Sequence, residues 1–370
     1  MSRKILCTVG TRPEVIKMAP VIAALRRRPW AEVRVLATAQ HREMLDRSMA
    51  AFGLDHEIDL NLMRPGQSLA QLTSRLFEAL EPTLLQEKPD LVLAQGDTTT
   101  VMAMAMTCFY LGIPFGHVEA GLRTGSLNNP FPEEFNRVVA GRVARLHFAP
   151  TERQQQFLLA EGVDPETIFV TGNTVIDALL ETAGRKPNLG FTFPEDQRLL
   201  LLTAHRRENF GAPLREIFLA VRDLVERHPD LCVLYPVHPN PNVQDPARAL
   251  LGGVDRIHLC EPLDYLPFVA AMQRAYIILT DSGGVQEEAP ALAKPVLVLR
   301  RETERPEAVE AGVVDLVGPD RGSILAKTSL LLNDPAAYRA MARGVSPYGD
   351  GRAAERISGI IESFFAASPS

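Results

Sequence analysis

Acidic residues stand directly after several short apolar segments of this chain. Asp97 follows the apolar segment 91–94, Glu119 follows 114–118, and Glu133 and Glu134 precede a segment with a helical pattern. A carboxylate at the carboxyl edge of a sheet can act as a general acid or base whose pKa is adjusted by its surroundings. For each position alone, a structural role such as helix N-terminal charge is equally open. Three acidic positions on one rim, namely Asp97, Glu119 and the adjacent pair at 133–134, together favour proton-transfer chemistry.

A second group of residues has the chemistry of a phosphate site. Ser-Gly-Gly at 282–284 lies between an apolar run and a helix-compatible segment, so backbone N–H groups could approach an anion there. Glu288, further into that helix, could accept hydrogen bonds from ribose hydroxyls. The alternative is an ordinary strand-to-helix turn capped by Asp281 or Ser282. Two adjacent glycines exceed what a cap requires and favour the phosphate site.

Basic residues follow two other apolar runs. Arg12 lies in the turn after the first run and Lys17 one turn into the helix that follows. The two could clamp a diphosphate, although solvated surface charge is the alternative. His205 follows the run 199–203. The sequence contains no HExxH motif, no Cys/His cluster with metal spacing and no P-loop, and its one formal GxGxxA match, at 349–354, follows no strand. We therefore expect neither a metal nor a dinucleotide cofactor.

Composition narrows the class of protein. Of 370 residues, 46% are hydrophobic and 23% charged, and the formal net charge of −6 argues against a general nucleic-acid binder. Four widely separated cysteines favour a reduced, cytosolic protein. Residues 98–118 carry no formal charge, but Gly112-Ile113-Pro114 interrupts them. This pattern predicts a buried helix over 99–111 and a strand, rather than a membrane span.

Apolar segments alternate with helical ones along the whole chain. Strands are predicted at 4–9, 32–37, 91–94, 114–118, 146–149, 168–171, 199–203, 232–236, 257–260, 277–280, 296–299 and 314–317. Their apolar character on both faces is typical of parallel strands covered on both sides, and the alternation with helices predicts βαβ units. A Gly/Pro-rich passage at 184–190 is the best linker candidate. We therefore predict an α/β fold of two Rossmann-like domains facing across a cleft.

Ten sequence motifs occur in the order found in one enzyme family. They are GTRPEVIKMAP (10–20), TAQHREML (38–45), GDTTT (96–100), GHVEAGLRTG (116–125), PFPEEFNR (130–137), TGNTVIDAL (171–179), HRRENFG (205–211), YPVHPNPNV (235–243), LTDSGGVQEEAP (279–290) and ERPEAV (304–309). By these motifs the chain resembles the bacterial non-hydrolysing UDP-N-acetylglucosamine 2-epimerases, over nearly its whole length.

The resemblance implies a GT-B architecture, with a first domain at 1–171, a second at 172–350 and a C-terminal helix at 351–367 that packs back on the first. It implies a cytoplasmic homodimer that interconverts UDP-N-acetylglucosamine and UDP-N-acetylmannosamine by eliminating and re-adding UDP through 2-acetamidoglucal, for cell-surface polysaccharide synthesis. It requires no cofactor, nucleic acid or membrane. The catalytic positions implied are Asp97, Glu119, Glu133 and His205. The substrate-binding positions implied are Arg12, Lys17, Phe268, Ser282, Gly283, Gly284, Glu288 and Arg305.

The chain also departs from the family pattern. At the position of Leu263 some relatives carry Gln, and in those relatives this side chain is the one expected to contact the nucleobase. Gln40-His41-Arg42 resembles a segment involved in activation by substrate, whereas Glu43 and Pro65-Gly66 differ from regulated relatives, so we expect weak cooperativity at most. Three alternatives share parts of the pattern: a GT-B glycosyltransferase, a hydrolysing epimerase and a non-catalytic nucleotide-sugar binding protein.

Overall fold

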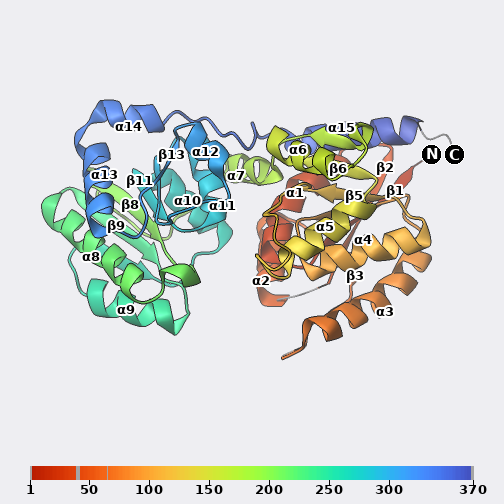
Figure 1. Cartoon of the computed structure of the whole chain (residues 1–370), viewed down its shortest axis with the longest axis horizontal. Helices are drawn as coiled ribbons and strands as arrows, with labels where there is room; N and C mark the ends of the chain where they lie inside the picture. Colours follow the sequence, from red (N-terminus) through yellow and green to blue (C-terminus); the bar gives the residue numbers. More distant parts are fainter. Residues whose placement is uncertain (1, 39–41, 65, 368–370) are drawn as a thin grey trace. The chain divides into compact units, whose positions relative to one another are not determined.

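The computed structural model describes residues 2–38, 42–64 and 66–367. The chain divides into two compact units: unit 1 comprises Met1–Ala178 and Tyr348–Ser370, and unit 2 comprises Leu179–Pro347 (Figure 1). The first division falls within the helix α7 (Thr174–Gly184). Each unit contains one parallel sheet with helices, which confirms the predicted α/β class with two Rossmann-like sheets.

Unit 1 is built on a seven-stranded sheet with the order β3-β2-β1-β4-β5-β6-β7. The strands are β1 (Arg3–Val9), β2 (Ala31–Ala37), β3 (Ile58–Asp59), β4 (Leu91–Gln95), β5 (Phe115–Val118), β6 (Leu146–Ala149) and β7 (Ile168–Val170). All of the pairings are parallel, and the order is that of doubly wound dinucleotide-binding folds with one strand added. Only β3 was not predicted, because two residues are too short to show a pattern.

Helices cover both faces of this sheet (Figure 1). They are α1 (Arg12–Arg26), α2 (Arg42–Ala51), α3 (Leu69–Glu87), α4 (Thr99–Leu111), α5 (Glu133–Val143), α6 (Glu152–Ala160) and α15 (Ala353–Ala367). Ile5 and Cys7 pack into the cluster with α1 and α15, whereas Leu6 packs into the cluster with α3 and α4. The alternating strand residues therefore enter two separate cores, as expected for a sheet buried on both sides.

The uncharged segment 98–118 folds as predicted, into the helix α4 and the strand β5 of this sheet. Most residues of α4 are buried, and Thr98 caps its start by accepting a hydrogen bond from the backbone N–H of Val101. Among the residues that the structure describes, no helix is both long enough and apolar enough to cross a membrane.

Unit 2 repeats the same topology with six strands, in the order β10-β9-β8-β11-β12-β13. The strands are β8 (Arg198–Thr203), β9 (Leu231–Pro236), β10 (Ile257–Cys260), β11 (Ile277–Thr280), β12 (Val296–Val298) and β13 (Val314–Leu316). The helices are α8 (Ala212–Arg227), α9 (Pro241–Leu251), α10 (Tyr265–Arg274), α11 (Gly283–Glu288), α12 (Pro306–Glu310), α13 (Arg321–Asn333) and α14 (Pro335–Met341). Because β8 and β11 are adjacent and parallel, the loops that follow them lie side by side.

The C-terminal helix α15 belongs to unit 1, where it packs on α1. Ile357 and Ile361 join the core that β1 and α1 form. Asp177 holds the start of this helix: its Oδ1 accepts a hydrogen bond from the backbone N–H of Ala354 (2.8 Å) and its Oδ2 one from Ala353 (3.2 Å). The carboxylate thereby satisfies two of the N–H groups that every helix leaves unpaired at its first turn.

Removal of this acceptor is expected to loosen α15. Asp177→Ala should lower the free energy of unfolding by about 1–2 kcal/mol, the usual effect of losing an N-terminal capping acceptor. Urea unfolding followed by circular dichroism measures it. Glu355→Ala, on the same helix, removes only an exposed ion pair to Arg352 and should leave the midpoint unchanged. Equal effects of the two variants would contradict the role given to Asp177.

A buried histidine joins the ends of β4 and β5. His117, on β5, is fully buried, and its Nε2 donates a hydrogen bond to the carbonyl oxygen of Gly96 (2.7 Å), one residue before Asp97. Burial lowers the pKa of His117 from 6.5 to about 4. The neutral ring therefore fixes the loop that carries Asp97.

This histidine makes folding pH-dependent in a defined window. Between pH 6.5 and about 4 the unfolded chain binds a proton at His117 that the folded chain does not, so stability falls as the pH falls. The shift corresponds to about 3 kcal/mol across the window. Since glutamine cannot titrate, His117→Gln should lose this part of the pH dependence in urea unfolding between pH 4.5 and 7.5. The slope of the free energy of unfolding against pH is compared between the two proteins, and the difference is the contribution of His117. Identical slopes would disprove that contribution.

Candidate active site

The loops after β1, β4 and β5 meet at one edge of the unit 1 sheet, because these three strands are parallel neighbours. The loop after β1 leads into Arg12, the first residue of α1, whose side chain is exposed. Asp97 follows β4 and Glu119 follows β5. The structure therefore brings together two of the three carboxylates that the sequence singles out, with Lys17 of α1 beside them.

Glu119 is held in an unusual conformation. Its φ of 64° lies in the left-handed region, which costs a glutamate of order 1 kcal/mol and persists only where surrounding contacts impose it. One carboxylate oxygen, Oε2, accepts from the Nζ of Lys17 at 2.5 Å and from the Nε2 of Gln95. Lys17, which the sequence suggested for a diphosphate clamp, thus forms an ion pair with a candidate catalytic carboxylate.

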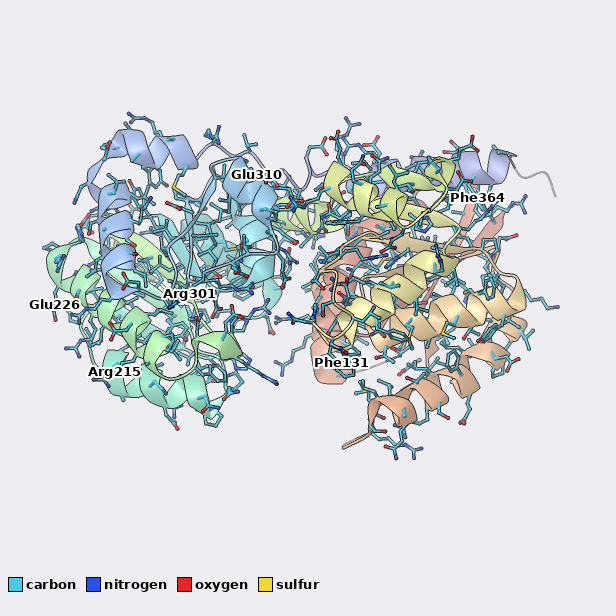
Figure 2. The ribbon with its side chains drawn as sticks, in the orientation of Figure 1. Phe131, Arg215, Glu226, Arg301, Glu310 and Phe364 are labelled. Carbon is cyan, nitrogen blue, oxygen red and sulfur yellow. The ribbon has the colours of Figure 1, made fainter. Side chains whose placement is uncertain are left out.

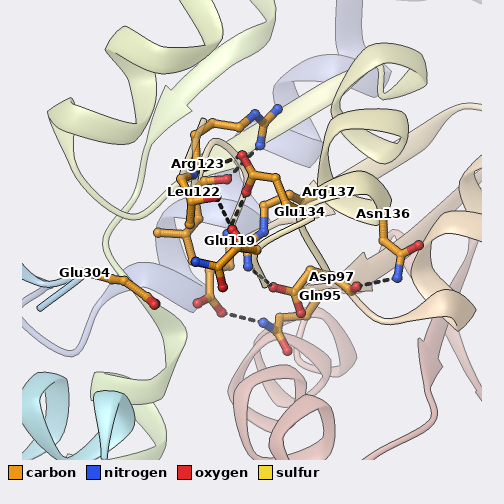
Figure 3. A network of polar contacts seen from close by, with 12 residues as sticks. Gln95, Asp97, Glu119, Leu122, Arg123, Glu134, Asn136, Arg137 and Glu304 are labelled. Atoms are coloured by element: carbon orange, nitrogen blue, oxygen red, sulfur yellow. Dashed lines mark hydrogen bonds and ion pairs between the residues drawn. The ribbon is translucent and has the colours of Figure 1, made fainter. Parts of the chain in front are cut away.

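Asp97 lies within a network that includes a buried arginine (Figure 3). Arg137 of α5 donates from Nη2 to Oδ2 of Asp97 at 2.6 Å, and Asn136 donates to the backbone carbonyl of Asp97 at 2.9 Å. Burial raises the pKa of Asp97; Arg137 opposes the rise, and the charge of Glu119 adds to it. A carboxyl with a raised pKa can hold a proton closer to neutral pH, as a general acid or base requires.

The adjacent pair Glu133 and Glu134 separates into two different environments. Glu134 is buried: its Oε2 accepts from Nη1 of Arg137 (3.1 Å), and its Oε1 accepts from the backbone N–H groups of Thr124 and Gly125. Glu133 begins α5 and is half-buried. It takes no part in the hydrogen bonds given above for Glu134. Phe131, in the same loop, is exposed (Figure 2). Glu134 therefore supports Arg137, and Glu133 retains a more accessible carboxylate.

A further buried carboxylate connects the loops after β1 and β4. Glu14 Oε2 accepts hydrogen bonds from the backbone N–H groups of Gly10 and Thr11, both at 2.7 Å. Its Oε1 accepts from the hydroxyl of Thr98, also at 2.7 Å. Desolvation raises the pKa of Glu14, and these hydrogen bonds oppose the rise. The start of α1, with Arg12, is thereby fixed relative to the loop that contains Asp97.

In unit 2 the corresponding loops follow β8 and β11. Ser282 occupies the N-cap position of α11, and its side chain makes no capping hydrogen bond in the part of the chain that the structure describes. The guanidinium of Arg305 lies on Gly283, where an added Cβ would come within 3.3 Å of its Cζ. Arg305 also donates from Nε to Oε1 of Glu287 (2.8 Å). Gly283 thus permits a cation to approach the first turn of α11, and the next residue, Gly284, is exposed.

Two further predicted binding residues lie close by. Glu288 is buried and accepts a hydrogen bond from the hydroxyl of Tyr265 (3.1 Å). Burial, followed by the neighbouring Glu288 carboxylate, raises the pKa of Tyr265, so its hydroxyl stays protonated and continues to donate. Phe268 lies one turn after Tyr265 on α10 and is half-buried. Tyr265, which carries no signal in the sequence, therefore links the two: Glu288 accepts its hydrogen bond, and Phe268 follows it on the same helix.

The contacts made by three further polar residues could not be predicted from the sequence, for a common reason. Gln95, Arg137 and Asp281 act through contacts with residues far away in the chain, and a sequence pattern does not show such contacts. Arg137 carried a local signal, since it lies three residues after Glu134 on one helix. Within the described residues, no group of three or more His, Cys, Asp or Glu side chains could hold a metal. Gln40, His41 and Pro65, on which the expectation of weak cooperativity depends, lie outside the described residues.

Comparisons with known proteins bear on this site. The family model described as UDP-N-acetylglucosamine 2-epimerase matches residues 23–362. The UDP-N-acetylglucosamine 2-epimerase of Escherichia coli (strain K12) is 50% identical over 364 residues, which cover 96% of this chain and 97% of that protein. These matches extend across both units.

Solved structures agree with the sequence relatives. A putative UDP-N-acetylglucosamine 2-epimerase from Listeria monocytogenes matches with a TM-score of 0.93 and 46% identity, over 100% of this chain and 98% of that one. The UDP-GlcNAc 2-epimerase from Neisseria meningitidis, in a structure bound to UDP-GlcNAc, matches with a TM-score of 0.89 and 45% identity, over 97% of this chain and 100% of that one. This chain belongs to the UDP-N-acetylglucosamine 2-epimerase family.

Proposed function

We propose that this protein interconverts UDP-N-acetylglucosamine and UDP-N-acetylmannosamine by inverting C2 of the sugar. The observation that carries the proposal is the pair of half-buried carboxylates, Asp97 and Glu119, each bound by a cation at adjacent strand ends. Family membership supports the substrate, since the Neisseria relative was solved with UDP-GlcNAc bound. The product would supply N-acetylmannosamine for cell-surface polysaccharide, and the reaction would take place in the cytoplasm.

The chemistry accounts for the need for several carboxylates. The hydrogen on C2 is not activated, so direct removal and return of this proton would be very slow. We propose elimination instead: a carboxylate takes the C2 proton, the C–H electrons form the C1–C2 double bond, and the C1–O bond to UDP breaks. UDP then adds back to C1 of the 2-acetamidoglucal while a proton reaches C2 from the opposite face. Two faces require two acid/base positions, for which Asp97, Glu119 and Glu133 are the candidates.

The remaining residues would bind UDP and stabilise its departure. We assign the diphosphate to Arg12, the turn of Ser282, Gly283 and Gly284, and Arg305, because negative charge develops there when the C1–O bond breaks. His205 would contact the same region. Phe268 and Glu288 would hold the nucleoside. Lys17 would also bind the diphosphate. It would do so either while it keeps its ion pair with Glu119 or after it leaves Glu119.

Incubation with UDP-N-acetylglucosamine alone in D2O tests the reaction by proton NMR. We expect UDP-N-acetylmannosamine with deuterium at C2, and traces of 2-acetamidoglucal and UDP at long times. Asp97→Asn keeps the shape but removes proton transfer, so turnover should fall by about 10²–10⁴-fold, with UDP affinity by calorimetry largely unchanged. Asp90→Asn, at the opposite end of β4, is the matched control and should turn over normally.

Each alternative function gives a different NMR result. A glycosyltransferase would form no epimer without an acceptor, a hydrolysing enzyme would release free N-acetylmannosamine and UDP, and a binding protein would leave the substrate unchanged. Epimer that retains its original C2 hydrogen in D2O would rule out elimination with exchange.

We also propose that the protein is a homodimer, and that the second copy binds the ends of α3 and α4. These adjacent helices lead into the parallel strands β4 and β5, so their C-terminal ends lie at the same edge of the sheet. Three large apolar side chains are exposed there: Leu85 (55%), Phe109 (64%) and Tyr110 (69%). A cluster of this kind on a soluble protein is typical of an association surface.

Light scattering after size exclusion tests the dimer. The wild-type protein should elute with twice the 40.7 kDa mass of one chain. Phe109→Glu combined with Tyr110→Glu should give the single-chain mass, because charges would be buried at the contact. Leu330→Glu, at an exposed apolar position in unit 2, should leave the dimer intact. A monomeric wild type, or a dimeric double variant, would refute this surface.

A further inference from the structure

Asp281 is a completely buried carboxylate that belongs to none of the positions assigned above. It follows β11, and its oxygens accept hydrogen bonds from the loop after β8. The backbone N–H groups of His205 and Arg206 donate to Oδ2 at 2.9 Å and 2.8 Å, and Asn209 Nδ2 donates to the same oxygen at 3.1 Å. Oδ1 lies 3.1 Å from the backbone N of His205. The carboxylate therefore fixes the loop on which His205 stands.

The imidazole of His205 lies directly beside this carboxylate. Its Nδ1 is 3.4 Å from Oδ1 of Asp281, and its side chain is 37% exposed. The ring of His238 stacks on it, with centroids 5.5 Å apart and an interplanar angle of 12°. The charged and titratable groups that act on His205 are Asp281, Arg206 and His238. Burial lowers the pKa of His205, and Asp281 opposes this fall.

A neutral imidazole carries one proton, on Nδ1 or on Nε2. An ionised carboxylate only accepts hydrogen bonds, so the nitrogen that faces Asp281 is the one that holds the proton. Nε2, on the other side of the ring, is then free to take up a proton. A buried aspartate fixes the histidine tautomer of a catalytic triad in the same way.

We infer that Asp281 is a positioning residue for His205: it holds the loop after β8 and keeps the imidazole proton on Nδ1, so that Nε2 is the nitrogen that exchanges a proton or hydrogen bond with bound substrate. This inference deepens the proposed function and rests on it for the contact between His205 and substrate. The tautomer itself does not depend on that function.

The substitution Asp281→Asn separates the two tasks of the carboxylate. The amide oxygen, in the place of Oδ2, can still accept from the N–H groups of His205, Arg206 and Asn209, which holds the loop. The amide NH2 then faces Nδ1 of His205 and donates to it, so the ring proton moves to Nε2. Asn209→Ala is the matched control, because it removes a donor to the same Oδ2 but faces no atom of the ring in the bonds described.

NMR of protein with 15N-labelled histidine rings reads the tautomer, with His205→Gln identifying the signals. We expect Nδ1–H in the wild type and in Asn209→Ala, and Nε2–H in Asp281→Asn. Nε2–H in the wild type would overturn the inference without need of any variant. An Asp281→Asn protein that keeps Nδ1–H would overturn it as well.

Kinetics then test whether the tautomer matters. We expect kcat of Asp281→Asn to fall by about 10²–10⁴-fold, with KM changed less than threefold and the melting temperature nearly kept. In a His205→Gln background the same substitution should cost little more, because its effect passes through the ring. Full additivity of the two losses would overturn the positioning role. A wild type with no epimerase activity but with Nδ1–H would refute the proposed function alone.

Discussion

The ion pair between the buried Arg137 and the half-buried Asp97 is the contact on which the candidate active-site edge of unit 1 depends. A carboxylate taken out of water must be matched by donors, and one guanidinium here binds both the buried Glu134 and the half-buried Asp97. Glu134 in turn binds the backbone at Thr124 and Gly125. The position of Asp97 therefore depends on α5 and on a loop before it, and not only on the strand that precedes it.

Unit 2 meets the same requirement with neutral donors. Asp281 has no solvent exposure, and backbone N–H groups and an asparagine amide surround it in place of a cation. These neutral donors bind the carboxylate without an ion pair to an arginine or lysine of the kind that unit 1 uses. Unit 1 instead combines Asp97 and Glu119 with Arg137 and Lys17, and the charges of Arg137, Glu119 and Lys17 all act on the pKa of Asp97. The two units thus hold these acids by different means: unit 1 uses ion pairs with cations, and unit 2 uses neutral donors from one loop.

The secondary structure could be predicted well because it depends on local pattern. The twelve predicted strands are found within one residue of their expected ends, whereas β3, with two residues, gave no periodic signal. Asp97 and Glu119 could be proposed as candidate site residues because they follow buried strands. Their partners were not, since Lys17 lies 102 residues from Glu119 in the chain and only the fold brings the two together. The domain limits at 1–171 and 172–350, the facing of the two domains and the roles of the site residues stay predictions.

The path of the chain has a consequence for the order of synthesis. The chain leaves unit 1 within α7 and returns to it at Tyr348, so unit 2 is an insertion between two parts of unit 1. Chains commonly fold from the N-terminal domain onward as they leave the ribosome. Here all of unit 2 is translated before α15, whose Ala354, Ile357 and Ile361 cover the core around β1 and α1. The first apolar core to emerge is therefore the last to be closed, and a nascent chain must keep it from aggregating until translation is almost complete.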